Sequence, residues 1–417
     1  MKTDKMRRRV EIISMLCLIL TGFVLANPVR KTIEVDGFER EYMVYTPSSH
    51  STEKAGGIIV CLHGFGRNMD DFFEEYDVTG IADLLNMIVV APQALPEQHD
   101  DVNGLLDTYG PLIGNGLSLH SVWGCGLGVE ATLLFLQLIN AELNKDLDDV
   151  NFIDRMIDEV ISDFDMPEEN IYMLGTSMGG YMTYQYALLN GDRLSGIISI
   201  AGSMGTKIKG MDHHIKVPVC DFHSLTDEVV HYNGPYMEEI MGWGLLNISL
   251  ATPMEQVINY WRETNGTGDP VTEKIDYYPS TNGITVEKFT YPEPDYEVIH
   301  YRIDGAPHSY FFSKDNGDCM DHAEEIMRFI QAHTTDNPNN NPVIPRQKAF
   351  FYPNPAYDMI YTSVTNGIVT VYDITGRSIL SQSFTEGRVD LSSLKSGIYI
   401  IRIQSGDIIH TGKLIKK

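Results

Sequence analysis

A serine flanked by glycines is the first feature of this chain that could carry chemistry. Residues 173–182 read MLGTSMGGYM, which places Ser177 between Gly175 and Gly179. An apolar, strand-like run (NIYML) precedes the serine, and a helix-like run (GGYMTYQYAL) follows it. In this context the glycines allow a strained strand-to-helix turn that exposes the serine oxygen as a nucleophile. A small residue that only fills a strand–helix junction is the alternative interpretation.

A serine hydroxyl needs a base that accepts its proton and an acid that orients the base. On α/β-hydrolase sheets the acid and then the histidine follow the serine along the chain, each after a strand. The loop after VPVCDFHS offers Asp227, with the adjacent Glu228 as the alternative acid, and the loop after YEVIHYRIDG offers His308. Three other titratable residues fall inside strand runs, where we expect packed side chains: Asp221, His223 and His300.

The negative charge that develops on an acyl oxygen requires preorganised backbone N–H donors. We expect one donor from Met178, directly after the serine, and a second from Phe65 in the stretch CLHGFGRN at 61–68. This mechanism needs no cofactor. The four cysteines after the N-terminal segment show no Cys-x-x-Cys spacing, so we expect no metal site.

The elements that must position these residues can be read from the apolar pattern between residues 27 and 333. Continuous apolar runs such as GGIIVCLHG, MIVVAPQA and LSGIISIAG suit strands that are buried on both faces. Helical patterns separate them: DDVNFIDRMIDEVISDF, MTYQYALLNGD and PMEQVINYWRET. The alternation predicts an α/β domain over 27–333, with a mostly parallel sheet flanked by helices. Together with the serine turn and the order of serine, acid and histidine, it predicts an α/β-hydrolase domain. KTIEVDGFEREYMVYTP predicts a strand pair that turns at Asp36-Gly37.

Two further features bear on the substrate. The strongly apolar segment 127–147 predicts a buried helix, with a lid over a lipid-like substrate as the alternative. Trp123 is interpreted either as a platform for a sugar or an aromatic acyl group, or as a buried structural tryptophan.

The two ends of the chain differ from its middle. The basic stretch MKTDKMRRR followed by IISMLCLILTGFVLA predicts a signal peptide over 1–26, with an uncleaved anchor as the alternative. No later stretch is long and apolar enough to span a membrane. Residues 334–348 are rich in Asn and Pro and predict a linker, and the short alternating runs of 349–417 predict a small all-β sandwich. The net charge of −26 argues against nucleic acid as a partner.

The C-terminal segment 349–417 resembles the sorting domain of the type IX secretion system of Bacteroidetes-type bacteria. The residues that carry the resemblance are YPNPA at 352–356, VYDITGR at 371–377, LKSGIYIIRI at 394–403 and the closing GKLIKK. The resemblance implies that this segment is an export address read by the type IX secretion machinery. The enzyme would then be released or kept at the outer cell surface, after export to the periplasm by the signal peptide.

The hydrolase segment is similar to the secreted polyhydroxybutyrate depolymerase and feruloyl esterase family, which overlaps carbohydrate esterase family one. The stretches LHGFGRNMDDFF, ENIYMLGTSMGGYMTYQYAL, VPVCDFHSLTDEVVHYNG and GAPHSYF carry this similarity. It implies Ser177, Asp227 and His308 as the catalytic triad and the HGFG loop as the oxyanion donor. We therefore expect an exported serine esterase that cleaves feruloyl or acetyl esters on plant polysaccharide. Polyester or lipid-like esters, peptides cleaved by a prolyl oligopeptidase-type enzyme, and a non-enzymatic surface binding module are the alternatives.

Overall fold

The computed structural model describes fifteen ranges of the chain: 27–47, 50, 56–76, 78–99, 120–133, 136–234, 236–239, 245–249, 251–334, 351–352, 356–362, 366–373, 376–385, 387–405 and 408–417. The predicted signal peptide over 1–26 lies outside them, as does the predicted linker apart from Thr334. Both therefore stay predictions.

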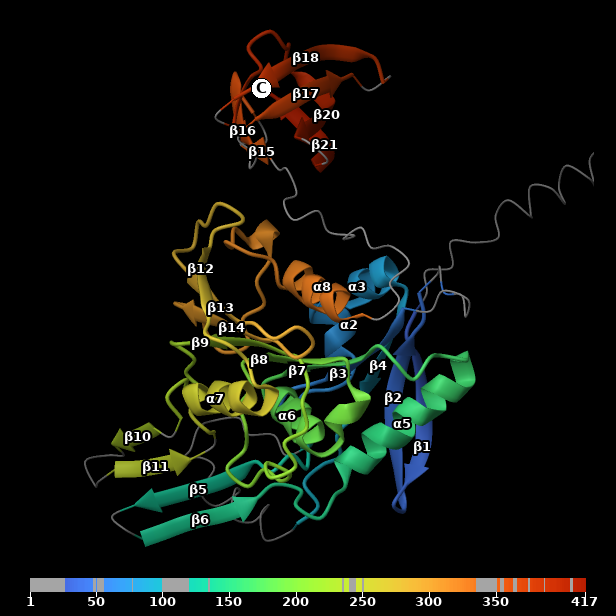
Figure 1. Cartoon of the computed structure of the whole chain (residues 1–417), viewed down its shortest axis with the longest axis vertical. Helices are drawn as coiled ribbons and strands as arrows, with labels where there is room; N and C mark the ends of the chain where they lie inside the picture. Colours follow the sequence, from blue (N-terminus) through green and yellow to red (C-terminus); the bar gives the residue numbers. More distant parts are fainter. Residues whose placement is uncertain are drawn as a thin grey trace, which may run out of the picture.

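A ten-stranded sheet forms the centre of the hydrolase domain (Figure 1), in the order β1-β2-β4-β3-β7-β8-β9-β14-β13-β12. The six strands from β4 to β14 in that order run parallel, and the strands at both edges are antiparallel. The bounds are β1 Val29–Val35, β2 Phe38–Tyr45, β3 Gly57–Leu62, β4 Met87–Pro92, β7 Ile171–Thr176, β8 Gly196–Ile200, β9 Val219–Ser224, β12 Val271–Ile275, β13 Thr285–Tyr291 and β14 Val298–Asp304. Every residue of β3, β4, β7, β8 and β9 is buried, which confirms the reading of continuous apolar runs as interior strands.

The predicted strand pair near the N-terminus is confirmed. β1 and β2 pair antiparallel, and the last pair of residues before the turn is Val35 opposite Phe38. Asp36 and Gly37, the two residues between them, have φ values of 53° and 83°. A two-residue hairpin turn with positive φ at both positions matches the right-handed twist of the strands, which explains the Asp-Gly pair.

Helices cover both faces of the sheet (Figure 1). On one face lie α2 Asp71–Glu75, α3 Val78–Leu85 and α8 His322–His333, and on the other lie α5 Asp149–Phe164, α6 Met178–Asn190 and α7 Met254–Asn265. The last three correspond to the predicted helices. The first turn of α5 is capped by the side chain of Asp148, which accepts from the backbone N–H of Asn151. None of the helices in the described ranges has the length and apolar character needed to cross a membrane.

The prediction of a buried helix over 127–147 is wrong, and so is the alternative of a helical lid. The segment instead contains strands β5 Gly128–Leu133 and β6 Leu136–Glu142. With β10 Tyr236–Glu239 and β11 Leu245–Ser249 they form a second, antiparallel sheet in the order β10-β11-β5-β6. The segment forms an antiparallel hairpin, with Leu133 of β5 opposite Leu136 of β6, and β11, more than a hundred positions later, pairs with the other edge of β5. A continuous apolar run does not distinguish such strands from a buried helix by its period.

The C-terminal domain is antiparallel throughout its two sheets, as predicted for a small all-β unit. One sheet contains β15 Phe351–Tyr352, β16 Met359–Thr362 and β19 Arg388–Asp390, and the other contains β17 Gly367–Tyr372, β18 Ser378–Phe384, β20 Gly397–Ser405 and β21 Ile408–Lys416. Alternate residues of the strands form its core, including Val369, Val371, Ile401, Ile403 and Leu414.

Candidate active site

Ser177 lies at the turn between β7 and α6, with φ 52° and ψ −121°. This conformation is costly for a residue with a Cβ and persists only where its surroundings fix it. The backbone N–H of Ser177 donates to the carbonyl of Ile200 at 2.8 Å. A Cβ on Gly175 would lie 2.1 Å from the Gly179 oxygen, and one on Gly179 would lie 1.8 Å from the Leu62 oxygen. Both glycines are therefore required by close backbone approach, as a strained strand-to-helix turn demands.

The structure brings the three residues of the predicted triad together. Nε2 of His308 lies 2.9 Å from Oγ of Ser177, and Nδ1 lies 2.8 Å and 3.0 Å from the two carboxylate oxygens of Asp227. Asp227 follows β9 and His308 follows β14, which are neighbours in the sheet. The carboxyl ends of parallel strands meet at one edge of a sheet, so the two loops lie beside each other. The alternative acid, Glu228, accepts from the backbone N–H of His308 at 3.0 Å, and not from its ring.

Asp227 is held in its ionised form. Burial opposes the charge, but the hydrogen bond and the charge of His308, the nearby ring of His223 and the Val229 N–H together keep the pKa of Asp227 below its usual value. Its Oδ1 also accepts from the backbone N–H groups of Val229 at 2.9 Å and Val230 at 2.7 Å. An ionised carboxylate on Nδ1 places the imidazole proton there and leaves Nε2 free to accept the serine proton.

The three titratable residues inside strands are packed, as predicted. Asp221, His223 and His300 are all buried. Nδ1 of His300 lies 2.8 Å from a carboxylate oxygen of Asp221, and the Tyr184 hydroxyl donates to the other oxygen at 2.9 Å. The Tyr232 hydroxyl forms a hydrogen bond of 2.9 Å with Nε2 of His300. Asp221, His300 and the two tyrosines thus satisfy one another. The ring nitrogens of His223 instead lie 3.0 Å and 2.7 Å from the backbone carbonyls of Gly202 and Val230, and its Nε2 lies 3.8 Å from Oδ2 of Asp227.

The two predicted oxyanion donors lie on either side of the serine turn. Met178 is the first residue of α6, and Phe65 belongs to the loop after β3. Among the residues that the structure describes, neither N–H donates to a protein acceptor. Gly64 lies against the nucleophile, because a Cβ added there would be 3.3 Å from the Cβ of Ser177.

The imidazole of His63 orients the Gly64–Phe65 peptide. Its Nε2 accepts from the backbone N–H of Ala94 at 3.1 Å, and burial lowers its pKa to about 4, so the ring is neutral. The single ring proton is therefore on Nδ1, which donates to the Gly64 carbonyl at 2.8 Å. Because C=O and N–H of a trans peptide point in opposite directions, the Phe65 N–H faces away from His63.

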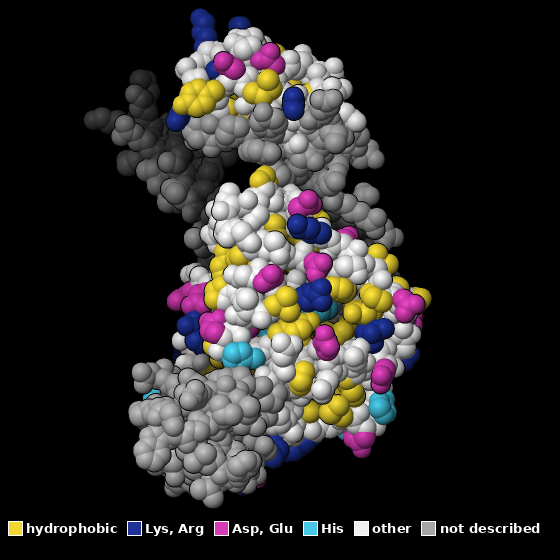
Figure 2. All heavy atoms as spheres, turned by 90° about the vertical axis from the view of Figure 1, so that its left-hand side faces the viewer, with side chains coloured by type: hydrophobic (Ala, Val, Ile, Leu, Met, Phe, Trp, Pro, Cys, Tyr) yellow, Lys and Arg dark blue, Asp and Glu magenta, His cyan; other side chains and the backbone are white. Residues whose placement is uncertain are grey.

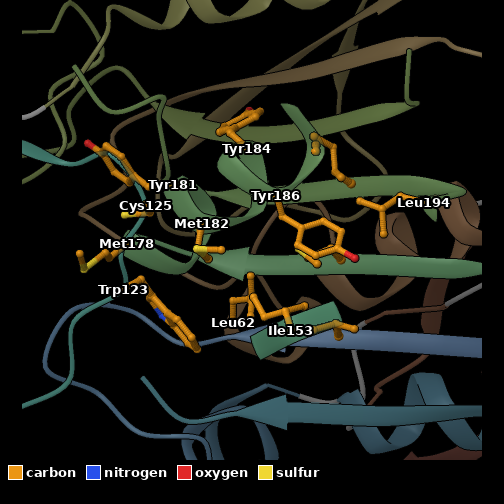
Figure 3. Packing of buried hydrophobic residues seen from close by; sticks show 14 of the residues in the cluster. Leu62, Trp123, Cys125, Ile153, Met178, Tyr181, Met182, Tyr184, Tyr186 and Leu194 are labelled. Atoms are coloured by element: carbon orange, nitrogen blue, oxygen red, sulfur yellow. The ribbon is translucent and has the colours of Figure 1, made fainter. Parts of the chain in front are cut away.

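The interpretation of Trp123 as a substrate platform is wrong, because its ring has no exposed surface. Its Nε1 donates to the backbone carbonyl of His63 at 2.9 Å, and the two rings lie 5.0 Å apart. Trp123 belongs to the same core cluster as Cys125 and Met178 (Figure 3). It is the structural tryptophan of the second interpretation, and it supports the loop that carries Phe65.

We expect Trp123→Phe to lower the free energy of unfolding by about 1–3 kcal/mol, because the buried His63 carbonyl loses its donor. We also expect kcat on p-nitrophenyl acetate to fall while KM stays unchanged. Urea unfolding and steady-state kinetics measure the two effects. A raised KM with unchanged stability would instead indicate that the ring contacts substrate.

A cavity of about 280 Å³ opens beside Ser177 and His308. Its walls include three aromatic residues from the loop after β3 and from α2 and its end: Phe65, Phe72 and Tyr76. Burial raises the pKa of the Tyr76 hydroxyl, which therefore stays neutral at physiological pH. The cavity thus combines an aromatic surface with the reactive serine.

A charged cluster at the mouth of this cavity was not predicted from the sequence. Arg67 pairs with Asp71 at 2.7 Å and with Glu75, and all three residues line the cavity. Their spacing of four residues each along RNMDDFFEE is the signal that could have identified them. One arginine between two carboxylates leaves the mouth with a net negative charge.

Charged side chains and cysteines also occur outside the cavity. Acidic and basic side chains are interspersed on the face drawn in Figure 2. The described residues contain no group of three His, Cys, Asp or Glu side chains that could hold a metal ion. Their four cysteines are free and buried: Cys61, Cys125, Cys220 and Cys319.

A serine on a strand-to-helix turn, above a mostly parallel sheet flanked by helices, defines the α/β-hydrolase class of serine hydrolases. Comparison with protein families makes the assignment more specific. Residues 134–240 match the family described as Phospholipase/Carboxylesterase, and residues 350–417 match the one described as Secretion system C-terminal sorting domain. The chain belongs to the α/β-hydrolase carboxylesterase family and carries a C-terminal type IX secretion sorting domain. This sorting domain indicates secretion or a place at the outer surface.

No curated protein matches the chain. Distant similarity to solved structures includes the acetyl xylan esterase from Aspergillus awamori, with 13% identity, a TM-score of 0.46 and coverage of 73% of this chain and 99% of that one. A CE1 ferulic acid esterase from Anaeromyces mucronatus has 14% identity, a TM-score of 0.42 and coverage of 75% and 92%. An S-formylglutathione hydrolase from Agrobacterium tumefaciens has 13% identity, a TM-score of 0.42 and coverage of 74% and 99%.

Proposed function

We propose that this carboxylesterase cleaves its substrates through an acyl-enzyme formed on Ser177. The observation that carries the proposal is the continuous hydrogen-bonded chain from Ser177 through His308 to Asp227. Each residue has the chemical type that its role requires, and the lowered pKa of Asp227 keeps that carboxyl ionised. No cofactor enters the mechanism.

In the proposed reaction, Nε2 of His308 accepts the hydroxyl proton while Oγ of Ser177 attacks the acyl carbon. Asp227 stabilises the imidazolium that forms and keeps the ring in place. The backbone N–H groups of Phe65 and Met178 stabilise the oxyanion. His308 then donates the proton to the leaving alcohol, and the same ring activates the water that hydrolyses the acyl-enzyme.

We propose feruloyl or acetyl groups on plant polysaccharide as the substrates. The cavity beside Ser177 supports a small or planar acyl group, because about 280 Å³ lies below the usual range for drug-sized ligands. Phe65 and Tyr76, which are half-buried, offer surfaces against which an aromatic acyl group can pack, whereas Phe72 is fully buried behind them. The charged mouth formed by Arg67, Asp71 and Glu75 disfavours a long lipid chain, since burying these groups against hydrocarbon is costly.

The proposal includes the division of the chain into segments that the sequence predicts. A signal peptide over 1–26 directs export to the periplasm, the esterase domain spans 27–333, and a linker at 334–348 joins it to the sorting domain at 349–417. The substrate would then be met outside the cell, where an acylated polysaccharide is accessible to an exported enzyme.

A panel of esters tests the substrate. We expect methyl ferulate and p-nitrophenyl acetate to be hydrolysed with a kcat/KM at least about tenfold above that of p-nitrophenyl palmitate, since the long chain does not fit the cavity. A dipeptide anilide and a short polyhydroxybutyrate oligomer should be poor substrates, and feruloylated or acetylated xylan should release free acid.

Three results would contradict this choice. Turnover of the anilide without ester activity would indicate a peptidase. Faster hydrolysis of the palmitate or of the polyester oligomer would indicate a lipid-like or polyester substrate. Failure of a fluorophosphonate probe to label the wild-type protein would indicate a binding module without a reactive serine.

A further inference from the structure

The loops that carry the acid and the histidine are joined by three alternate side chains of the acid loop. Ser224 is the last residue of β9, and Thr226 and Glu228 lie on either side of Asp227 in the loop that follows. The side chain of each of these three residues bonds to the backbone of residues 305–308. None of these bonds involves a reacting atom. They fix where one loop lies relative to the other.

The carbonyl of Ala306 is the centre of this contact. It accepts from Oγ of Ser224 at 2.6 Å and from Oγ1 of Thr226 at 3.0 Å. The Gly305 N–H donates back to Oγ1 of Thr226 at 3.2 Å. The two hydroxyl oxygens lie 3.0 Å apart, so one hydroxyl proton can be shared between the Ala306 carbonyl and the other hydroxyl, and the three groups form one small network.

Glu228 completes the contact at the histidine itself. Its Oε2 accepts from the backbone N–H of His308 at 3.0 Å. The main chain of His308 is thus held by Glu228, while its ring is held by Asp227. Two carboxylates that are adjacent in the sequence therefore bind His308, one at its backbone N–H and the other at its ring.

The loop that carries His308 needs such support because no hydrogen bonds of a helix or strand fix its conformation. Residues 305–309 belong to no helix or strand, and both Gly305 and Ser309 have positive φ, 93° and 54°. Asp227 and His308 come from different strands, so their separation depends on the register between two irregular loops. A displacement of about 1 Å at a catalytic group can cost about 100-fold in rate.

We propose that Ser224, Thr226 and Glu228 are positioning residues that act as one clamp, defined by these three side chains, and set the distance from Asp227 to His308 and from His308 to Ser177. The proposal rests on the function proposed above. The clamp contributes to the chemical step and not to the binding of substrate, because its members bond only to the loop backbone and to one another.

Thr226→Val tests the clamp, with Thr226→Ser as its matched partner. Valine keeps the shape of threonine and removes the hydroxyl, whereas serine keeps the hydroxyl. We expect Thr226→Val to lower kcat on p-nitrophenyl acetate about tenfold with KM unchanged, and Thr226→Ser to restore most of it. Thr226 is exposed, so both variants should fold, which thermal unfolding checks.

Glu228 supplies a second pair of variants. Glu228→Ala removes the acceptor of the His308 N–H and should lower kcat, whereas Glu228→Gln keeps an acceptor oxygen and should retain most of the activity. Combined with Thr226→Val, the alanine variant should lower kcat by about 100-fold, the cost of a displaced base.

The outcomes separate the clamp from the function on which it rests. Thr226→Val and Glu228→Ala with wild-type kcat, in a preparation whose Ser177→Ala variant is inactive, would overturn the clamp alone. A Thr226→Ser variant as slow as Thr226→Val would also overturn it, because the hydroxyl would not be the reason. An active Ser177→Ala variant would overturn the proposed function itself.

Discussion

Ser177→Ala is expected to lower kcat/KM for p-nitrophenyl acetate by at least about 10⁴-fold, to the rate that oxyanion stabilisation and binding alone provide. The variant loses the only atom that can form the acyl bond, while His308 and Asp227 remain in place. Alanine keeps the Cβ of serine, so the strain of the positive φ at this turn is unchanged. We therefore expect the midpoint of thermal unfolding to stay close to that of the wild type.

A fluorophosphonate probe measures the same residue independently of the substrate. It should label the wild-type protein and Ser280→Ala, an exposed control in the same domain, and it should not label Ser177→Ala. Labelling of Ser177→Ala would mean that another serine is the nucleophile. Lost activity with a large drop in the unfolding midpoint would mean that the change acts through the fold.

The sequence predicts this site well because each of its residues lies at the end of a buried strand. Continuous apolar runs locate β7, β9 and β14, and the chain order of serine, acid and histidine then restricts the choice to a few loops. The hydrogen-bond partners of Asp227 and Glu228 decide between adjacent carboxylates, which spacing alone does not do.

What the sequence does not predict depends on contacts between distant segments. The apolar residues of 127–147 suit a buried helix and a strand pair equally well; in the structure they form the hairpin of β5 and β6, which extends into a sheet through the distant strand β11. From the sequence, Trp123 could either contact substrate or belong to the core. In the structure it is buried and donates to the carbonyl of His63, sixty positions earlier, so it belongs to the core. In both cases a partner that lies far away in the chain completes the arrangement.

Asp227→Asn is expected to lower kcat by about 10⁴-fold through the tautomer of His308. In the wild type, Oδ1 of Asp227 accepts from two backbone N–H groups, those of Val229 and Val230. In the variant these donors hold the amide oxygen at the Oδ1 position, 3.0 Å from Nδ1 of His308, and the NH2 group takes the Oδ2 position, the nearer of the two at 2.8 Å. This nearer contact favours Nδ1 as an acceptor, so the ring proton moves to Nε2, where it faces Ser177 and blocks proton transfer.

Glu228→Gln is the matched control for this variant, because it makes the same chemical change one residue away. Steady-state kinetics on p-nitrophenyl acetate should show a large loss for Asp227→Asn and a small one for Glu228→Gln. The reverse order would assign the acid to Glu228, and equal losses would indicate that the net charge of the loop matters more than either carboxylate.

The stability of Asp227→Asn as a function of pH gives an independent check. The pKa of Asp227 is lower in the folded protein than in the unfolded chain, so its ionisation stabilises the fold. That contribution is complete above the unfolded pKa of about 3.9 and is lost as the pH falls through the folded value. Wild type should therefore be more stable than the variant at neutral pH, and the difference measured by urea unfolding should shrink below about pH 4. A constant difference across this range would mean that Asp227 is not held as a carboxylate by its contacts with His308 and the loop.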